Sequence, residues 1–263
     1  MKEQHLYAVR DKPLTGKALS RYQLLRVWEV QVHARLSSWL GTPQALERMI
    51  IPPAYYAATL QQDSSQIEQY YIDICRLSPI PLLLYNFPAN SAGQDLSAKS
   101  IIRIIENSPN LCGLKLTCPG RMDKLEQVTA SVKTNPEFLI LDGVMHDLPA
   151  WKEFGGHGTV SGISNIAPSS TVRLWNLCCV ENPSLEQQKE LREVLNVLSK
   201  VDAVVMPLGV RGLKYVLGYL HGYGRVPRRP LLALDEDNGK LVTDLLAELL
   251  VLENKYEVQA VDC

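Results

Sequence analysis

Short apolar runs and amphipathic stretches alternate along most of the chain. Apolar runs predict buried strands at 49–51, 81–86, 111–117, 138–143 and 158–163. Apolar residues at helical spacing predict the helices between these strands, at 63–77, 97–108, 121–134 and 148–154. Strands that alternate with helices roughly every 20 to 30 residues are typical of parallel βαβ units.

Beyond Pro168 the strand pattern ends, and residues 184–257 predict mainly helices. We therefore expect an α/β fold, a (β/α)8 TIM barrel followed by a helical C-terminal extension. Such a barrel needs eight strands, whereas the pattern provides five, and residues 19–40 predict a helix. The barrel is accordingly expected to be N-terminally truncated or incomplete. The expected divisions are an atypical N-terminal segment at 1–48, β/α barrel units at 49–180 and the helical extension at 181–263.

Composition and charge exclude several classes of protein. Hydrophobic residues make up 46% of the 263 residues and charged residues 21%, which argues against a disordered or low-complexity chain. The 27 Lys and Arg residues balance 28 Asp and Glu residues, so we expect no nucleic-acid partner. No run of about 18 apolar residues occurs, so we expect no membrane partner either.

Cysteine usage and the first residues bear on the compartment. The six cysteines include no CxxC pair, which predicts reduced thiols and a cytoplasmic location. The first 40 residues carry seven Lys and Arg against three Asp and Glu, which keeps the mitochondrial matrix as an alternative. The histidines show no metal-ligand spacing, so no metal site is expected.

Two motifs carry the candidate chemistry, Tyr85-Asn86-Phe87-Pro88 and Gly113-Leu114-Lys115-Leu116-Thr117. Because side chains alternate along a strand, Lys115 is expected to point into the barrel. An apolar interior favours a neutral amine, the form that attacks a ketone to give a Schiff base. Tyr85, at the C-terminal end of its strand, is expected to relay protons beside it. A purely structural alternative stays open, in which Lys115 reaches water from a strand end and Tyr85 is a core aromatic.

These motifs and three others together resemble the dihydrodipicolinate synthase and N-acetylneuraminate lyase family of pyruvate-handling class I aldolases. The others are Pro52-Pro53-Ala54-Tyr55-Tyr56, Asp142-Gly143 and Gly155-Gly156-His157-Gly158-Thr159-Val160-Ser161. The resemblance implies that Lys115 forms the Schiff base and that Tyr85 relays protons. It also places Gly143 and Val160 beside the bound keto acid, and Tyr56 in the site of a neighbouring subunit.

The loop after Tyr85 departs from the true synthases, which carry there an Arg-Thr-Gly that binds the carboxylate of the second substrate. This chain has Ala89-Asn90-Ser91-Ala92-Gly93, in which Asn90 is our candidate for substrate binding. The resemblance therefore implies cleavage of 4-hydroxy-2-oxoglutarate or a 2-keto-3-deoxy sugar acid to pyruvate and an aldehyde, without a metal or organic cofactor. Two alternatives stay open. One is dihydrodipicolinate synthase, and the other is a catalytically inactive interaction subunit, because the family's carboxylate-binding Gly-x-x-Gly-Glu segment is missing.

The resemblance also implies an assembly. Relatives are homotetramers built from tight dimers, so a homo-oligomer is expected if the barrel is complete, with a small 2-oxo acid as its substrate. An open barrel, in contrast, leaves two sheet edges and an apolar interior uncovered. We therefore expect the chain as written to aggregate or to fold only in part.

Overall fold

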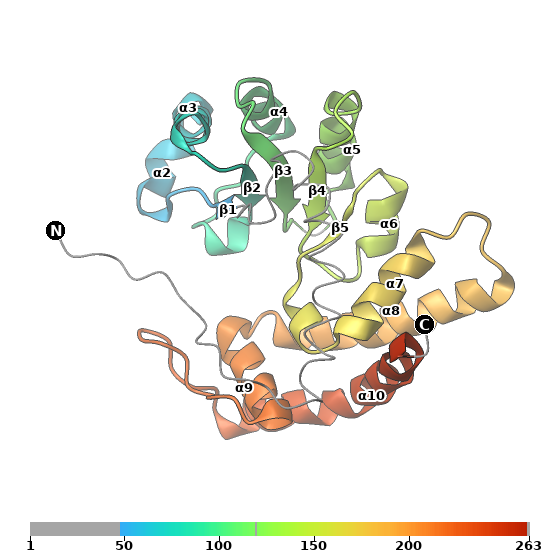
Figure 1. Cartoon of the computed structure of the whole chain (residues 1–263). Helices are drawn as coiled ribbons and strands as arrows, with labels where there is room; N and C mark the ends of the chain where they lie inside the picture. Colours follow the sequence, from blue (N-terminus) through green and yellow to red (C-terminus); the bar gives the residue numbers. More distant parts are fainter. Residues whose placement is uncertain (1–47, 119, 262–263) are drawn as a thin grey trace.

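The computed structural model describes residues 48–118 and 120–261, and it contains one parallel sheet in this part of the chain. Neighbouring strands in the sheet follow the order of the sequence, so each strand pairs with the next one along the chain (Figure 1). The strands are β1 (Arg48–Ile50), β2 (Leu82–Asn86), β3 (Leu111–Leu116), β4 (Leu139–Asp142) and β5 (Gly158–Thr159). This sequential parallel order is that of adjacent βα units in a barrel.

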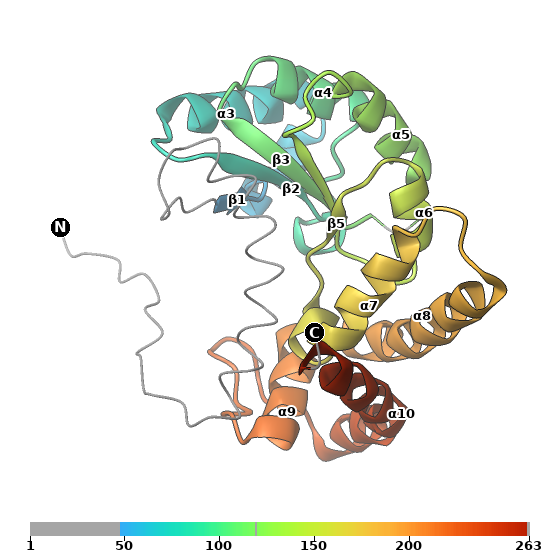
Figure 2. The same cartoon turned by 45° about the vertical axis from the view of Figure 1, so that its right-hand side comes forward.

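Helices between the strands cover the outer side of the sheet, as the turned view shows (Figure 2). They are α2 (Ala57–Leu60), α3 (Ser64–Leu77), α4 (Ala98–Glu106), α5 (Met122–Ser131) and α6 (Leu148–Glu153). The side chains of Asp63 and Ser97 cap α3 and α4 by accepting backbone N–H groups, which explains where these helices begin. Alternate strand residues, among them Leu84, Leu114 and Ile140, pack against the helices in one apolar cluster.

A second apolar cluster joins the helices that follow the sheet. They are α7 (Pro168–Cys178), α8 (Leu185–Val205), α9 (Gly209–His221) and α10 (Glu236–Val261). The buried carboxylate of Glu253 on α10 accepts the backbone N–H groups of Ser169 and Ser170 at 2.8 Å each. Since these N–H groups lie in the first turn of α7 and have no partner within the helix, Glu253 acts as its cap.

The sequence predicted the strand–helix alternation, its parallel character and the helical tail, and the structure confirms them. The strand predicted at 158–163 was too long, because only Gly158–Thr159 pair with β4. The hydroxyl of Ser161 accepts the N–H of Ile163 at 3.3 Å and starts a 3-10 helix at Gly162–Asn165, which ends the strand.

Some expectations remain predictions. The helix at 19–40 and the count of strands before β1 concern residues 1–47, which lie outside the part that the structure describes. The division at residue 180 also remains a prediction. We note that α7, which precedes it, shares its apolar cluster with α8 and α10, which follow it.

Candidate functional site

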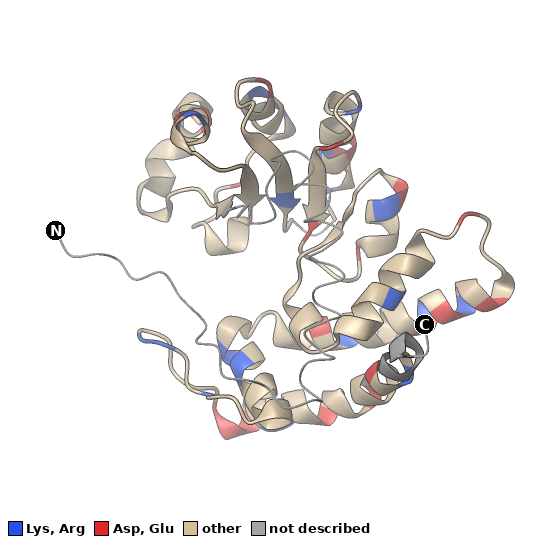
Figure 3. Cartoon of the chain, in the orientation of Figure 1, with Lys and Arg blue, Asp and Glu red and all other residues tan. Residues whose placement is uncertain are grey.

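The inner face of the sheet brings Tyr85 and Lys115 together. Tyr85 on β2 pairs with Lys115 on β3 in the strand register, and Lys115 in turn pairs with Leu141 on β4. Figure 3 shows charged residues mainly on the helices, and Lys115 is the one charged residue in the sequences of β2 and β3. Its neighbours on the inner face are apolar, since Leu83, Leu139 and Leu141 form a small buried cluster there. Strand alternation therefore predicted the direction of Lys115 correctly.

Lys115 is almost fully enclosed. The residue is 8% exposed, and its Nζ lies 4.2 Å from the centroid of the Tyr85 ring. No residue in the described part of the chain forms an ion pair with it, and the Tyr85 ring face provides a favourable cation–π contact. An amine held in this way has a fixed direction of attack and little water around it, which is what imine formation requires.

Thr117 and Gly143 extend this inner face toward the C-terminal ends of the strands. The Thr117 hydroxyl lies 3.5 Å from the Tyr85 hydroxyl, and it was not among the site residues expected from the sequence. An added Cβ at Gly143 would overlap the Thr117 hydroxyl and meet the Thr117 Cβ at 2.9 Å. Only glycine therefore lets β3 and β4 approach so closely at this point. The signal for Thr117 was present, because it lies two residues after Lys115 on the same face.

Val160 follows β5 at the same edge of the sheet. Its backbone N–H donates to the carbonyl oxygen of Asp142 at 2.9 Å, which fixes it beside the end of β4. The residue is 36% exposed. Gly143 and Val160 thus lie on neighbouring strand ends.

Tyr56 and Asn90 lie on the surface. Tyr56 is 62% exposed in the short 3-10 helix Ala54–Tyr56, and its ring contacts Tyr55 with a centroid distance of 4.9 Å. Asn90 is exposed in the 3-10 helix Pro88–Asn90 and donates its N–H to the carbonyl of Phe87 at 3.0 Å. Within the described residues, no hydrogen bond or ring contact joins either side chain to Lys115 or Tyr85, and their roles stay predictions.

Asn86 fixes the end of β2 from the outer face. Its Nδ2 donates to Asp95 Oδ1 at 2.8 Å, and its Oδ1 accepts the N–H of Leu96 at 3.0 Å. Its carbonyl accepts the N–H of Thr117 at 2.9 Å, which continues the ladder to β3. Because Asn86 directly follows Tyr85, these bonds hold the backbone that carries the tyrosine.

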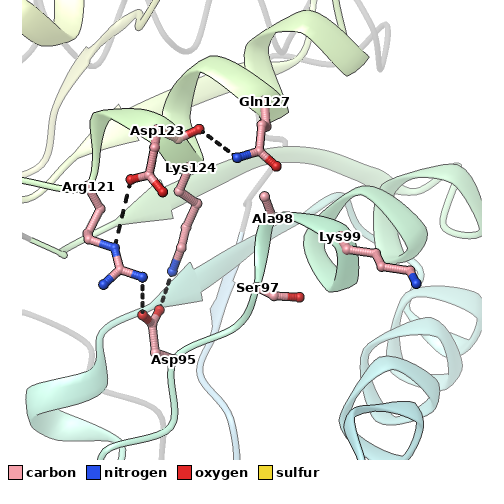
Figure 4. A pocket seen from close by; sticks show the side chains of 8 residues that line it. All are labelled: Asp95, Ser97, Ala98, Lys99, Arg121, Asp123, Lys124 and Gln127. Atoms are coloured by element: carbon pink, nitrogen blue, oxygen red, sulfur yellow. Dashed lines mark hydrogen bonds and ion pairs between the residues drawn. The ribbon is translucent and has the colours of Figure 1, made fainter.

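Asp95 is in turn held by two cations from the start of α5 (Figure 4). Lys124 Nζ forms an ion pair with Asp95 Oδ1, and Arg121 lies 3.7 Å from Asp95 Oδ2. Burial opposes ionisation of Asp95, but these cations and Asn86 outweigh it and hold the pKa of the carboxyl below its usual value. A cavity of about 360 Å³ opens beside this ion pair, between α4 and α5. It lies on the outer side of the sheet and does not include Lys115.

Asp142 is a buried residue to which the sequence analysis gave no role. The residue is 2% exposed, and its Oδ1 accepts the N–H groups of Gly143 at 2.6 Å and Val144 at 3.0 Å. Its Oδ2 is buried and has no hydrogen-bond partner among the described residues. Burial and the nearby carboxylates Asp147 and Asp202 raise the pKa of Asp142 to about 7, although the two N–H groups act against them.

The described residues contain no group of three or more His, Cys, Asp or Glu side chains that could hold a metal ion. Within the same residues, no helix is both long enough and apolar enough to cross a membrane.

Comparison with known proteins agrees with this geometry. The chain is 31% identical over 211 residues to "Probable 4-hydroxy-2-oxoglutarate aldolase, mitochondrial" of Emericella nidulans. The aligned region covers 80% of this chain and 65% of that relative. The chain is 29% identical to L-threo-3-deoxy-hexylosonate aldolase of Hypocrea jecorina, covering 83% of this chain and 68% of the relative. The matches thus span about two thirds of the length of these curated relatives.

Solved structures confirm the β/α-barrel fold class. The 4-hydroxy-tetrahydrodipicolinate synthase of Methylacidiphilum fumariolicum matches with a TM-score of 0.67 and 23% identity, over 80% of this chain and 66% of that one. A Sulfolobus 2-keto-3-deoxygluconate aldolase matches with a TM-score of 0.62 and 21% identity, over 77% of this chain and 64% of that one. The model of the dihydrodipicolinate synthetase family matches residues 45–249, most of the sequence. The buried Lys115 beside Tyr85, the parallel βα units and these matches agree, and the chain belongs to the dihydrodipicolinate synthetase family.

Proposed function

We propose that this chain is a Schiff-base (class I) aldolase. It cleaves a 4-hydroxy-2-oxo acid, such as 4-hydroxy-2-oxoglutarate or a 2-keto-3-deoxy sugar acid, to pyruvate and an aldehyde. The observation that carries the proposal is Lys115, enclosed on the inner face of the sheet with its Nζ 4.2 Å from the Tyr85 ring centroid. The names of the curated relatives support the reaction class and both kinds of substrate.

The reaction follows from an amine held beside a phenol. Lys115 Nζ attacks C2 of the substrate, and loss of water gives an iminium ion. The C4 hydroxyl then loses its proton, the C3–C4 bond breaks, and its electron pair flows into the iminium as the aldehyde departs. The resulting enamine takes a proton at C3, and hydrolysis releases pyruvate and restores the amine. Tyr85 relays the protons, and Thr117, 3.5 Å from its hydroxyl, continues the relay toward the strand ends.

The remaining expected residues have roles in this proposal. Gly143 and Val160, on adjacent strand ends, flank the keto acid, and Asn90 contacts it from the loop after β2. Tyr56 reaches into the site of a second subunit, for which its 62% exposure leaves it available. The assembly is a homotetramer, which light scattering of the purified chain tests.

Imine trapping tests the assignment of the lysine. The chain is incubated with pyruvate and borohydride, and the labelled peptide is identified by mass spectrometry. Lys124 is an internal control, because it is also buried but forms an ion pair with Asp95. We expect label on Lys115 and none on Lys124. Label on another lysine, or undiminished cleavage by a Lys115→Ala variant, contradicts the proposal.

A second candidate is a synthase activity. The chain is 28% identical to 4-hydroxy-tetrahydrodipicolinate synthase of Teredinibacter turnerae, over 74% of its length. A rate of condensation of pyruvate with aspartate semialdehyde that exceeds the rate of aldol cleavage favours the synthase. Saturable pyruvate binding without either reaction favours an inactive interaction subunit.

The compartment is part of the proposal. The Emericella nidulans relative has "mitochondrial" in its name, which supports the mitochondrial matrix over the cytoplasm. Fractionation of cells that express the tagged full-length protein decides between the two compartments.

A further inference from the structure

Buried carboxylates hold the loop between β4 and α6, whose first residue, Gly143, packs against Thr117. Asp142 Oδ1 accepts the N–H groups of Gly143 and Val144, and Asp202 Oδ2 on α8 accepts that of Met145 at 3.2 Å. Three successive N–H groups of this loop therefore end on acidic side chains that are nearly inaccessible to water. The loop has no regular structure that could satisfy them in another way.

Contacts lead from Asp142 to the amine without interruption. Its carboxylate holds Gly143, whose bare Cα leaves only enough room for the Thr117 side chain. The Thr117 hydroxyl contacts that of Tyr85, whose ring lies against Lys115 Nζ. A displacement of Gly143 toward Thr117 would overlap its side chain at once, so the position of Gly143 limits where the tyrosine hydroxyl can lie.

Asp142 also holds the neighbouring strand. Its carbonyl oxygen accepts the N–H of Val160 at 2.9 Å and the hydroxyl of Thr159 at 3.2 Å. One residue thus fixes both Gly143 and Val160, the two backbone positions proposed to flank the keto acid.

We propose that Asp142 is a positioning residue of the Schiff-base site. Its carboxylate fixes Gly143, and through Gly143 and Thr117 it sets the place of the Tyr85 hydroxyl beside Lys115. This inference rests on the proposed function, and it adds a residue that touches neither the substrate nor the amine.

The charge of Asp142 strengthens this role. An ionised carboxylate binds N–H groups more strongly than a neutral acid does. Burial raises the pKa of Asp142 to about 7, so the ionised form takes over near neutral pH. The groups that face it are Asp147 at the start of α6 and Asp202 on α8, while His146 pairs with Asp147 at 2.9 Å. Positioning is therefore strongest well above pH 7, where Asp142 is fully ionised, and it weakens as the pH falls through about 7.

The test compares two buried carboxylates, each of which accepts two adjacent backbone N–H groups. Asp142→Asn and Asp142→Ala change the residue proposed to position the site. Glu253→Gln is the matched control, because Glu253 also accepts two adjacent backbone N–H groups but lies on α10 and caps α7. Each full-length variant is assayed for cleavage of 4-hydroxy-2-oxoglutarate across pH 5.5 to 9, a window of roughly two units on either side of neutrality. Imine trapping on Lys115 is measured in parallel.

We expect kcat to fall about tenfold in Asp142→Asn and about a hundredfold in Asp142→Ala, with KM changed by less than about threefold. The inflection of the wild-type profile near pH 7 is expected to disappear in Asp142→Asn. Glu253→Gln is expected to keep both kcat and the profile. Wild-type kcat and an unchanged pH profile in folded Asp142→Asn and Asp142→Ala overturn the inference, as does an equal loss in Glu253→Gln.

A spectroscopic readout separates this inference from the proposed function. The ring signals of 13C-labelled Tyr85, assigned with a Tyr85→Phe variant, report its environment without turnover. We expect them to shift in Asp142→Asn and to stay in place in Glu253→Gln. If the wild type traps no pyruvate, the proposed function fails, and these ring signals still decide whether Asp142 positions the tyrosine.

Discussion

Replacing Asp95 by alanine should destabilise the fold, because it leaves a buried cation without its anion. Lys124 is only 4% exposed in its side chain, and Asp95 also accepts from Asn86 Nδ2 at 2.8 Å. Removing one partner of a fully buried ion pair costs about 3–5 kcal/mol. Asp95 is 30% exposed, so water replaces part of the lost interaction, and we expect a loss of about 2–3 kcal/mol in the free energy of unfolding.

Urea denaturation followed by circular dichroism measures this loss. The exposed pair of Arg76 and Asp73 provides the control, since these side chains are 68% and 42% exposed and Asp73→Ala should cost less than about 1 kcal/mol. The pKa of Asp95 is lowered in the fold, so its contribution is present above about pH 4 and is lost as the pH falls through the folded pKa. A loss in Asp95→Ala no larger than in Asp73→Ala would refute the reasoning.

Three further predictions concern Gly143, Glu253 and Asp142. Gly143→Ala should reduce kcat at least about tenfold in the cleavage assay, because its Cβ overlaps the Thr117 side chain. Glu253→Ala should lower the free energy of unfolding by about 2–3 kcal/mol in urea, because two N–H groups of α7 lose their acceptor. Burial raises the pKa of Asp142 to about 7, so its neutral form is favoured in the fold and wild-type stability should fall as the pH rises from about 4 to 7. Urea titrations of Asp142→Asn should show a weaker fall over this range. Unchanged kcat in Gly143→Ala contradicts the first expectation, and unchanged stability in Glu253→Ala contradicts the second. The third is contradicted if the stability of the wild type and of Asp142→Asn depends on pH in the same way.

Local patterns in the sequence were sufficient for the sheet and for the reactive pair. The runs around Leu84, Leu114 and Ile140 predicted strands because buried parallel strands are apolar on both faces. The alternation of side chains then predicted that Lys115 points inward, and the structure confirms its place beside Tyr85. Both predictions depend on neighbours within one strand, which the sequence displays directly.

Contacts between distant segments could not be predicted in this way. Asp95 and Lys124 are 29 positions apart on different units, and nothing near either residue indicates the other. The sequence showed that Asp142 precedes a glycine, which is typical of a turn. It did not show that α8, which begins 43 positions later, brings Asp202 close enough to affect its pKa. Burial and charge of this kind arise from packing, and a single sequence carries no local trace of them.

The cap on α7 has a consequence for how the chain folds during its synthesis. Pairing between β2 and β3 joins residues about 30 positions apart, such as Tyr85 and Lys115. The bond from Ser170 to Glu253 spans 83 positions, so the start of α7 lacks its acceptor until residue 253 has left the ribosome. Domains fold as their segments become available, and distant contacts form late. The lysine and tyrosine should therefore be aligned early on the nascent chain, while the helices that follow the sheet are still exposed to chaperones and proteases.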